Sequence, residues 1–315
     1  MVALVGPTAS GKSALALAVA GAARPAGSVE LLSVDSMAVY RGMDIGTAKP
    51  TPEVRARVPY HLVDLVDASA AFTVSEFQAA ARRALAGVAG RGHAGLLVGG
   101  TGLYLRAVVD GLELPGRYPE VSRRLEGELD AAGVPGSDGE VAALGRLHAR
   151  LAALDPVAAG RIEPANRRRL VRALEVTEGA GRPFSSFGPG LETYPPTPVH
   201  LVGIRPDPTE TDRRIAERVD AMMAAGLLEE VRSLAAAPGG LSPTARQALG
   251  YRELLSHLED GVPLGTAVDE TVRRTRTFAR RQWAWFRRDP RIVWLEDDDD
   301  PVARILGLFD EPVQD

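Results

Sequence analysis

A short apolar run, VALV at residues 2–5, leads directly into the glycine-rich loop GPTASGKS at residues 6–13. Gly6, Gly11, Lys12 and Ser13 fit the pattern G-x-x-x-x-G-K-[ST], which needs a strand before it and a helix after it. Residues 12–23 have a helical pattern. The backbone N–H groups of such a loop and the N-terminus of the following helix bind phosphate oxygens, although a plain glycine turn is the alternative. This feature predicts a parallel α/β sheet with a phosphate-binding loop.

Further apolar, β-rich runs end at turn residues, and helical patterns separate most of them. The expected strands are residues 2–5, 29–34, 61–66, 95–98, 199–204 and 291–295. Thr73 and Glu76 form a capping box that predicts a helix to about residue 89. This order is typical of a doubly wound parallel sheet, the fold of P-loop proteins.

Strand signals are missing between residues 114 and 196, where helices are expected at residues 119–131, 140–154 and 164–178. We therefore expect a helical insertion domain at residues 114–196. The P-loop catalytic core then comprises residues 1–113 and 197–295, with helices before the last strand. Residues 296–315 form a tail with eight acidic residues and one arginine, which we expect to be disordered.

The composition limits the classes of function. The chain has no cysteine, which excludes disulfides and thiolate metal sites, and its five histidines lack ligand spacing, so a zinc site is not expected. No signal sequence or membrane-spanning run is visible, so we expect a cytoplasmic protein without membrane contact. The net charge of the chain is −4. The tail carries −7, so residues 1–295 carry +3. Only Lys12 and Lys49 among 37 basic residues are lysine.

Two polar residues each follow the end of an apolar run. Asp35 follows LLSV, and Thr101 stands among glycines after LLV. Because the C-terminal ends of parallel strands meet at one ligand crevice, Asp35, Thr101 and the phosphate loop are expected to face one another. Both residues also suit a local reading, in which Asp35 caps a turn and Thr101 marks a tight strand-to-helix turn. The second run lacks the carboxylate that a nucleotide hydrolase uses to hold its metal.

Together with the loop GPTASGKS, six further segments make the chain recognisable. They are DSMAVYRGMDIGTAKP at 35–50, VGGTGLYLRA at 98–107, RRLVRALEV at 168–176, RRIAERVDAMMAAGLLEEV at 213–231, RQALGYRE at 246–253 and RRTRTFARRQWAWFR at 273–287. In this order they resemble the tRNA dimethylallyltransferases over nearly the whole chain. DIGTAKP and GGTGLYLRA are far more specific than the phosphate loop.

The resemblance implies transfer of a dimethylallyl group from dimethylallyl diphosphate to N6 of the adenosine at tRNA position 37, 3′ to the anticodon. Asp35 is then the general base, with Thr101 and Arg214 as further catalytic residues, although Arg214 in a charged helix also suits a solvated face. Mg²⁺ is the expected cofactor, with Ser13 as its ligand. The family also implies a monomer with no obligate protein partner. The residues expected to bind diphosphate are Gly6, Thr8, Ala9, Ser10, Gly11, Lys12 and Ser13.

The resemblance also implies contacts with the anticodon stem-loop. The tRNA-binding residues expected from it are Asp35, Ser36, Met37, Ala38, Thr101, Arg168, Arg169, Arg172, Arg246, Gln247, Gly250 and Tyr251. The three insertion arginines would meet phosphates, or would simply form a solvated helix face. A helix expected at residues 268–288 mixes arginines with aromatic residues, which fits RNA contact or aromatics packed on the sheet.

Three other functions stay open at this point. An adenylate isopentenyltransferase would act on free AMP and would lack an RNA-binding insertion. A P-loop small-molecule kinase would bind and consume ATP, with Asp35 holding an acceptor hydroxyl. A non-enzymatic RNA-binding module would need neither a complete phosphate loop nor a base at a strand end.

Overall fold

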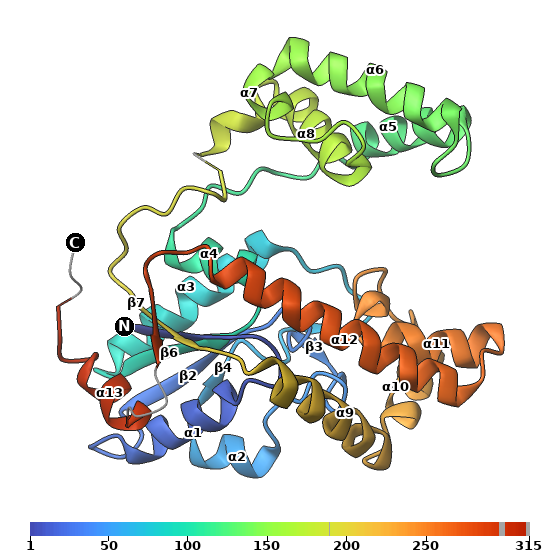
Figure 1. The fold of residues 1–315 in the computed structure, drawn as a ribbon. Coiled ribbons are helices and arrows are strands. Elements are labelled where there is room, and N and C mark those ends of the chain that lie inside the picture. Colours follow the sequence, from blue (N-terminus) through green and yellow to red (C-terminus); the bar gives the residue numbers. More distant parts are fainter. Residues whose placement is uncertain (189, 296–299, 313–315) are drawn as a thin grey trace. The chain divides into compact units, whose positions relative to one another are not determined.

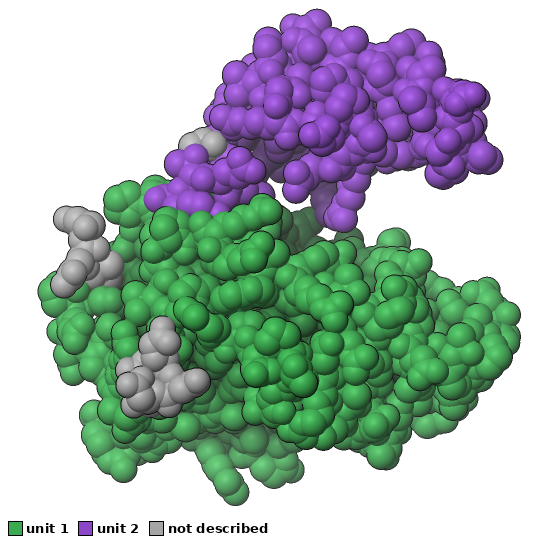
Figure 2. Space-filling view, in the orientation of Figure 1, with its two compact units in different colours: residues 1–111, 195–315 green, residues 112–194 purple. Residues whose placement is uncertain are grey.

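The computed structural model describes residues 1–188, 190–295 and 300–312, and these form two compact units. Unit 1 comprises residues 1–111 and 195–315, and unit 2 comprises residues 112–194 (Figure 2). The chain therefore passes from unit 1 to unit 2, and back to unit 1, two residues before the boundaries expected from the sequence. No helix among the described residues is long and apolar enough to cross a membrane.

Unit 1 is built on a six-stranded sheet in the order β4-β2-β6-β1-β7-β8, and all neighbouring strands are parallel (Figure 1). Strand β1 lies between β6 and β7, which places the phosphate loop near the centre of the sheet edge. The fold is the P-loop-type α/β architecture expected from the sequence. The strands are β1 Val2–Val5, β2 Val29–Val34, β4 Tyr60–His61, β6 Ala94–Gly99, β7 His200–Ile204 and β8 Ile292–Leu295.

Alternate residues of the central strand enter two separate hydrophobic cores. Val2 and Leu4 pack with helix α1 on one face, whereas Ala3 and Val5 join the larger core on the other face. This division follows from the period of two along a strand. All four side chains are fully buried, so the sheet is covered on both faces, as parallel sheets require.

Helices of unit 1 cover the sheet on both faces (Figure 1). Helix α3 begins with the predicted capping box, because Thr73 accepts from the N–H of Glu76 and Glu76 accepts from the N–H of Thr73. The predicted helix at 268–288 begins four residues earlier, after Pro263. The helices are α1 Lys12–Ala22, α2 Pro52–Arg57, α3 Val74–Gly90, α4 Gly102–Val109, α9 Pro208–Ala224, α10 Leu227–Ala236, α11 Tyr251–Asp260 and α12 Leu264–Phe286.

The expectation of a single strand at residues 61–66 is wrong. Tyr60–His61 forms β4 of the main sheet, and Val66–Asp67 forms β5, which pairs with β3 (Tyr40–Arg41) in a separate two-stranded sheet. Leu62 and Asp64 between them have positive φ angles of 65° and 56°. This left-handed backbone cannot continue a strand, so the chain turns from one sheet to the other.

The disordered tail is also a wrong expectation for its described part. Pro301–Gly307 forms helix α13, and the Asp300 carboxylate caps it by accepting from the N–H groups of Val302 and Ala303 at 3.1 Å each. Ile305 is fully buried against the core that contains α1. Burial of a short apolar helix face thus stabilises a helix here in spite of the acidic composition of the tail. Residues 296–299 and 313–315 of the tail lie outside the described residues.

Unit 2 is a helical unit with its own core. Leu125 and Leu129 of α5, Leu147 of α6 and Leu174 of α8 meet in it. Helix α8 begins at Arg167 rather than at Pro164, because the Asn166 side chain caps it by accepting from the N–H of Arg169 at 3.2 Å. The helices are α5 Pro119–Ala132, α6 Asp138–Leu154, α7 Pro156–Ala159, α8 Arg167–Ala180 and the 3₁₀ turn η1 Phe184–Phe187.

The two points where the chain leaves and re-enters unit 1 are joined by polar contacts. Nη1 of Arg291 lies 2.7 Å from Asp110 and donates to the Pro195 carbonyl at 2.6 Å. The Thr197 hydroxyl donates to the Val109 carbonyl at 3.2 Å. Because the Asp110 side chain is fully buried, these contacts fix both ends of the inserted segment at one place in unit 1.

Candidate active site

The phosphate loop leaves the N-terminus of α1 open to a ligand. Gly11 is the N-cap residue, with φ 90°, and no side chain caps the helix. Ala9 also has a positive φ, 61°, so the loop curls with its backbone in the left-handed region twice. No acidic residue stands in the first turn. The free N–H groups and the positive end of the helix dipole therefore form an anion site.

Cationic side chains from two helices line this loop. A concave region of about 230 Å³ is bordered by Ala9, Gly11, Lys12, Ser13, Ala14, Arg214 and Arg218. Arg214 of α9 is half-exposed, and a Cβ placed on Gly11 would lie 3.9 Å from its Nη1 atom. Its Nε donates to Glu210 at 2.7 Å, which orients the guanidinium. The structure thus brings Arg214 to the loop, 200 residues away in sequence.

Lys12 is half-buried beneath the loop, where Nζ donates to the Pro7 carbonyl at 3.0 Å. Burial lowers the pKa of Lys12 to about 8; the charge of Asp35 opposes this shift and the charge of Arg218 adds to it. Burial likewise lowers the pKa of Arg218, again opposed by Asp35. The cations are therefore poorly solvated before a ligand binds, so an anion would relieve the cost of their burial.

Arg218 is a site residue that sequence reasoning missed. It stands one helical turn after Arg214 on α9, so both side chains lie on the same helix face. Among the described residues it has no ion-pair partner. Burial lowers the pKa of its guanidinium. The spacing of four residues from Arg214 was the available signal. In an arginine-rich chain that signal did not stand out.

Asp35 and Thr101 lie at the same sheet edge as the loop. Val34 of β2 pairs with Gly99 of β6, so the residues after these strands are neighbours. Asp35 Oδ1 accepts from the N–H groups of Met37 at 2.7 Å and Ala38 at 3.3 Å. Asp35 Oδ2 accepts no hydrogen bond within residues 1–188, 190–295 and 300–312, and the residue is half-buried.

The Thr101 hydroxyl is oriented by the strand that carries Asp35. Its Oγ1 accepts from the Ser36 N–H at 3.3 Å, while the Thr101 N–H donates to the Val34 carbonyl at 3.4 Å. Both local readings of these residues are therefore correct in part, because Asp35 forms a turn and Thr101 is the N-cap residue of α4. Each still keeps one polar group for a ligand: the Oδ2 atom of Asp35 and the O–H proton of Thr101.

The segment DIGTAKP forms a loop that contacts Glu230 and is joined to Asp64 through Lys49. Glu230 of α10 accepts from the N–H groups of Asp44 at 2.9 Å and Ile45 at 2.8 Å, and of Gly46 at 3.1 Å. Lys49 has a side chain that is only 1% exposed and donates to Asp44 at 2.8 Å and Asp64 at 2.6 Å, and to the Tyr40 carbonyl at 2.5 Å. A compact ammonium with three acceptors explains a lysine here.

The predicted tRNA residues of unit 1 differ in accessibility. Arg246 is half-buried in the turn η2 (Ala245–Gln247) and pairs with Glu259, whereas Gln247 is exposed and accepts from Arg252 at 3.4 Å. Gly250 is the N-cap residue of α11, with φ 85°. Ser36 and Met37 are half-buried, and Ala38 is buried.

Tyr251 does not fit the prediction of a direct tRNA contact. Its ring is fully buried, and its hydroxyl donates to Glu230, which holds the DIGTAKP loop. Burial raises the pKa of this hydroxyl well above its usual range. A Cβ on Gly46 would lie 2.4 Å from the ring, which explains the glycine of that motif. Tyr251 therefore supports the loop from inside the core.

In unit 2 the three predicted arginines have different environments. Arg168 and Arg169 are exposed at the start of α8, and neither forms an ion pair with another described residue. Arg172 instead donates to the carbonyls of Pro115 at 2.9 Å and Gly116 at 3.0 Å, and pairs with Glu175 at 2.8 Å. Arg172 thus fixes the chain where it enters α5, whereas Arg168 and Arg169 have no such contacts among the described residues.

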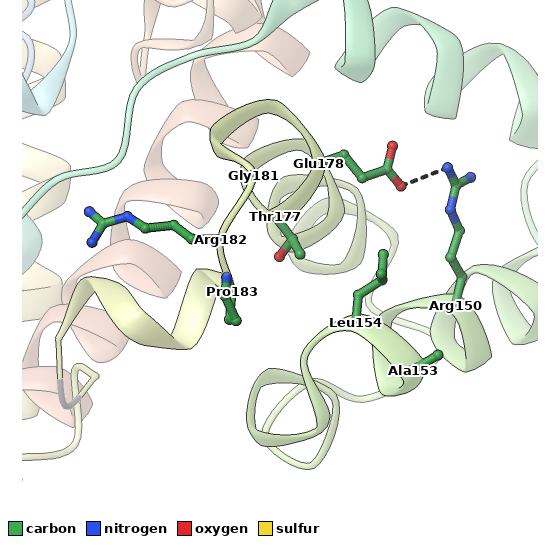
Figure 3. Close-up of a pocket in the computed structure, with 8 residues that line it drawn as sticks. All are labelled: Arg150, Ala153, Leu154, Thr177, Glu178, Gly181, Arg182 and Pro183. Carbon is green, nitrogen blue, oxygen red and sulfur yellow. Dashed lines mark ion pairs between the residues drawn. The ribbon is translucent and has the colours of Figure 1, made fainter.

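The larger hollow described in this chain, about 640 Å³, lies in unit 2 and contains none of the predicted residues (Figure 3). Glu178 and Arg150 on its wall form an ion pair of 2.8 Å. Arg182 pairs with Glu113 and stacks 3.7 Å from the centre of the Phe187 ring. Since every charged group that lines it is already paired, the hollow lacks the unpaired cations of the phosphate loop.

Two of the scattered histidines meet at the opposite end of the sheet. His61 and His93 lie 2.5 Å and 2.7 Å from the two oxygens of Glu30, which also accepts two hydrogen bonds from Arg91. Those bonds from Arg91 lower the pKa of Glu30 to about 2. Neither these three side chains nor any other such group among the described residues is arranged to hold a metal ion. The cluster stabilises the start of β2.

Comparisons with known proteins identify the family of this chain. The model of the IPP transferase family matches residues 38–289, a range that begins after the phosphate loop and Asp35. A tRNA dimethylallyltransferase of a Nocardioides species is 48% identical over 313 residues, which cover 99% of this chain and 94% of that protein. The tRNA dimethylallyltransferase of Streptomyces coelicolor is 46% identical over 318 residues, covering 99% and 96%.

Solved structures also match this chain. The tRNA isopentenylpyrophosphate transferase from Bacillus halodurans matches with a TM-score of 0.67 and 34% identity, over 98% of this chain and 95% of that one. A eukaryotic dimethylallyltransferase acting on tRNA matches with a TM-score of 0.75 over 100% and 81%, but at 22% identity this likeness concerns the fold alone. The resemblance seen in the sequence motifs is confirmed, and the chain belongs to the IPP transferase family.

Proposed function

We propose that this chain transfers a dimethylallyl group from dimethylallyl diphosphate to N6 of the adenosine 3′ to the anticodon, at tRNA position 37, and releases diphosphate. The observation that carries this proposal is the placement of Asp35, whose Oδ2 accepts no hydrogen bond from the described residues, at the sheet edge where Lys12 and the phosphate loop lie. A base and an anion site must act together in a displacement of diphosphate by nitrogen.

On the diphosphate side, the free N–H groups of α1 and the cations Lys12, Arg214 and Arg218 bind the leaving group. Negative charge grows on the departing oxygens as the C–O bond breaks. Fixed dipoles and cations that are already in place stabilise that charge without reorganisation. The Thr101 O–H donates to the same group, since its oxygen already accepts from Ser36.

On the acceptor side, Asp35 takes the proton of N6. The lone pair of this amine is delocalised into the adenine ring, so the nitrogen is a weak nucleophile and needs a base. As N6 attacks the allylic carbon, a new C–N bond forms, the C–O bond breaks, and one N6 proton moves to Asp35 Oδ2. The two backbone N–H groups on Oδ1 keep the carboxylate in place.

The residues present are compatible with Mg²⁺, which commonly binds to few protein ligands and to substrate phosphates. Ser13 is exposed on the wall of the phosphate region and offers one hydroxyl oxygen, so the diphosphate and water would complete the coordination. When bound, the ion neutralises charge on the leaving group. Lys12, Arg214 and Arg218 hold the diphosphate at the loop in either case.

We further propose that RNA, rather than free AMP, is the acceptor. Unit 2 presents Arg168 and Arg169 without ion-pair partners among the described residues, and unit 1 presents Arg246 on its surface. Such arginines suit phosphates of a nucleic acid backbone. A small nucleotide would need no contacts of this kind beyond its own pocket.

One experiment tests the proposal and its competitors together. The protein is incubated with Mg²⁺, labelled dimethylallyl diphosphate and one of two acceptors, unmodified tRNA or AMP. We expect N6-dimethylallyladenosine at position 37 in the tRNA and no labelled AMP. Label in AMP alone would indicate an adenylate isopentenyltransferase. A parallel incubation with ATP in place of dimethylallyl diphosphate completes the test: phosphorylation there, without prenyl transfer in the first incubation, would indicate a kinase, and either result would overturn the proposal.

A further inference from the structure

A buried glutamine connects the two loops of the site. Gln282 of α12 is only 8% exposed. Its Oε1 accepts from the N–H of Thr8 in the phosphate loop at 2.8 Å, and its Nε2 donates to the Gly100 carbonyl at 2.9 Å. Because an N–H must face the amide oxygen and a carbonyl must face the amide nitrogen, these two partners fix the orientation of the amide.

The glycines around Thr101 are shaped by the same helix. A Cβ on Gly100 would lie 2.3 Å from Gln282 Nε2, and a Cβ on Gly102 would lie 2.1 Å from the ring nitrogen of Trp285. Gln282 and Trp285 are three residues apart, so they lie on one face of α12. A side chain at either glycine would require Gln282 or Trp285 to move.

Through these contacts α12 controls both halves of the reaction centre. Thr8 belongs to the loop that binds the leaving group. Gly100 precedes Thr101, whose hydroxyl accepts from the N–H of Ser36 next to Asp35. One amide therefore spans from the diphosphate side to the side that carries the base. The separation of these two sides sets the distance over which N6 must reach the allylic carbon.

We propose that Gln282 is a positioning residue that holds the phosphate loop and the Thr101 loop at the separation needed for transfer. This inference rests on the proposed function. Gln282 spans the loops without touching Oδ2 of Asp35, so it acts through Thr8 and Thr101. Its loss should lower kcat, because the reacting atoms are misaligned. It should leave diphosphate binding almost unchanged, because Lys12, Arg214 and the α1 N-terminus remain.

The test compares Gln282→Met with a matched control, Gln78→Met. Gln78 is another buried glutamine, 7% exposed on α3, whose Nε2 donates to the Ala107 carbonyl at 2.6 Å. Both variants lose a buried amide of the same size. For Gln282→Met we expect kcat to fall by roughly 10- to 100-fold and the Kd for dimethylallyl diphosphate to change by less than about threefold. For Gln78→Met we expect a kcat within about twofold of the unsubstituted protein.

Gln282→Glu adds a pH signature that a packing role would not produce. The carboxylate can accept from Thr8 but repels the Gly100 carbonyl, whereas the protonated acid can donate to that carbonyl. The ratio of its kcat to that of the unsubstituted protein should therefore rise as the pH falls from 8 to 5.5. Equal kcat losses in Gln282→Met and Gln78→Met, or a pH-independent ratio for Gln282→Glu, would overturn the proposal.

Amide hydrogen exchange separates failure of this inference from failure of the proposed function. Peptides that contain Thr8 and residues 99–102 should exchange faster in Gln282→Met than in Gln78→Met, whether or not the protein modifies tRNA. Faster exchange in a protein without transferase activity would refute the function and keep the coupling of the loops. Unchanged exchange would refute the coupling, even in an active enzyme.

Discussion

The charge of Lys12 affects the free energy of folding. Lys12 lies under the phosphate loop, and burial lowers its pKa to about 8, against an ordinary value of 10.5. The ammonium is therefore present below pH 8 and is lost as the pH rises through that value. Its charge costs folding free energy below pH 8, and this cost is relieved between pH 8 and 10.5. A bound diphosphate would compensate for that cost.

This lysine makes binding of the substrate depend on pH. Between pH 7 and 8 the affinity for dimethylallyl diphosphate should be nearly constant, and above pH 8 it should fall by up to roughly tenfold per pH unit as Lys12 loses its proton. Calorimetric titration from pH 7 to 9.5 measures this. Lys12→Arg serves as the control, because guanidinium stays charged; a similar decline in that variant would assign the effect to another group.

Asp35 permits a sharp substitution. Asn at this position keeps an oxygen that accepts from the N–H groups of Met37 and Ala38, so the turn should survive. It cannot take a proton from N6. We expect Asp35→Asn to lower the rate of prenyl transfer to tRNA by about 10²- to 10⁴-fold, with diphosphate binding within a few-fold. Single-turnover transfer at the unsubstituted rate would remove Asp35 from the role of base.

At the scale of elements, the DIGTAKP loop depends on groups from distant parts of the chain. Glu230 of α10 binds three successive backbone N–H groups, and Tyr251 of α11 supports Glu230. Contacts with α10 and α11 therefore add to the loop's own turn hydrogen bonds, in which the N–H groups of Ala48 and Lys49 donate to the carbonyls of Ile45 and Asp44 at 3.0 Å each. Lys49 closes it from the inner side by joining Asp44 to Asp64.

We expect Lys49→Met to lower the free energy of unfolding by about 1–3 kcal/mol, because it removes a buried ammonium that donates to Asp44, Asp64 and the Tyr40 carbonyl. Urea unfolding of the full chain checks this value. Arg41→Gln is a suitable comparison, since its ion pair with Asp67 is exposed at 53% and 73% and should contribute less than about 1 kcal/mol. Similar losses in both variants would contradict the argument from burial.

Helix α8 carries two kinds of arginine, and the proposed function separates them. Replacing Arg168 and Arg169 by Ala should weaken tRNA binding and reduce the slope of log affinity against log salt concentration by roughly 1 to 2, since two phosphate contacts are lost. Arg146→Ala, at an exposed arginine of α6, should leave the slope unchanged. An unchanged slope in the double variant would show that this end of α8 does not bind RNA.

At the scale of the whole molecule, local signals predicted much of the architecture. The loop between β1 and α1, the capping box of α3 and the helices of the insertion are each encoded within a few residues. Local signals failed at Leu62 and Asp64, because their positive φ angles end the strand although neither residue is a glycine that would mark the turn in the sequence. They failed again at α13, where burial of Ile305 outweighs acidic composition.

The candidate site was predictable to the extent that it is local. Gly6, Lys12, Ser13 and Asp35 could be identified from motifs at strand ends. Arg218 and Gln282 could not, because their relation to the loop depends on how α9 and α12 pack. The hydrogen bond between Thr8 and Gln282 spans 274 positions in the chain. Burial of Tyr251 was hidden for the same reason, since a motif does not show which side chains face inward.

The contacts of Arg291 with Asp110 and Pro195 have a practical consequence for the inserted segment. Since the chain departs and returns at adjacent points, a bridge of roughly three to five glycines could replace residues 112–194 without stretching the scaffold. The shortened protein should fold by itself and bind dimethylallyl diphosphate as the full chain does. The helical segment is thus an excisable module, which would allow prenyl-donor binding to be engineered apart from choice of RNA.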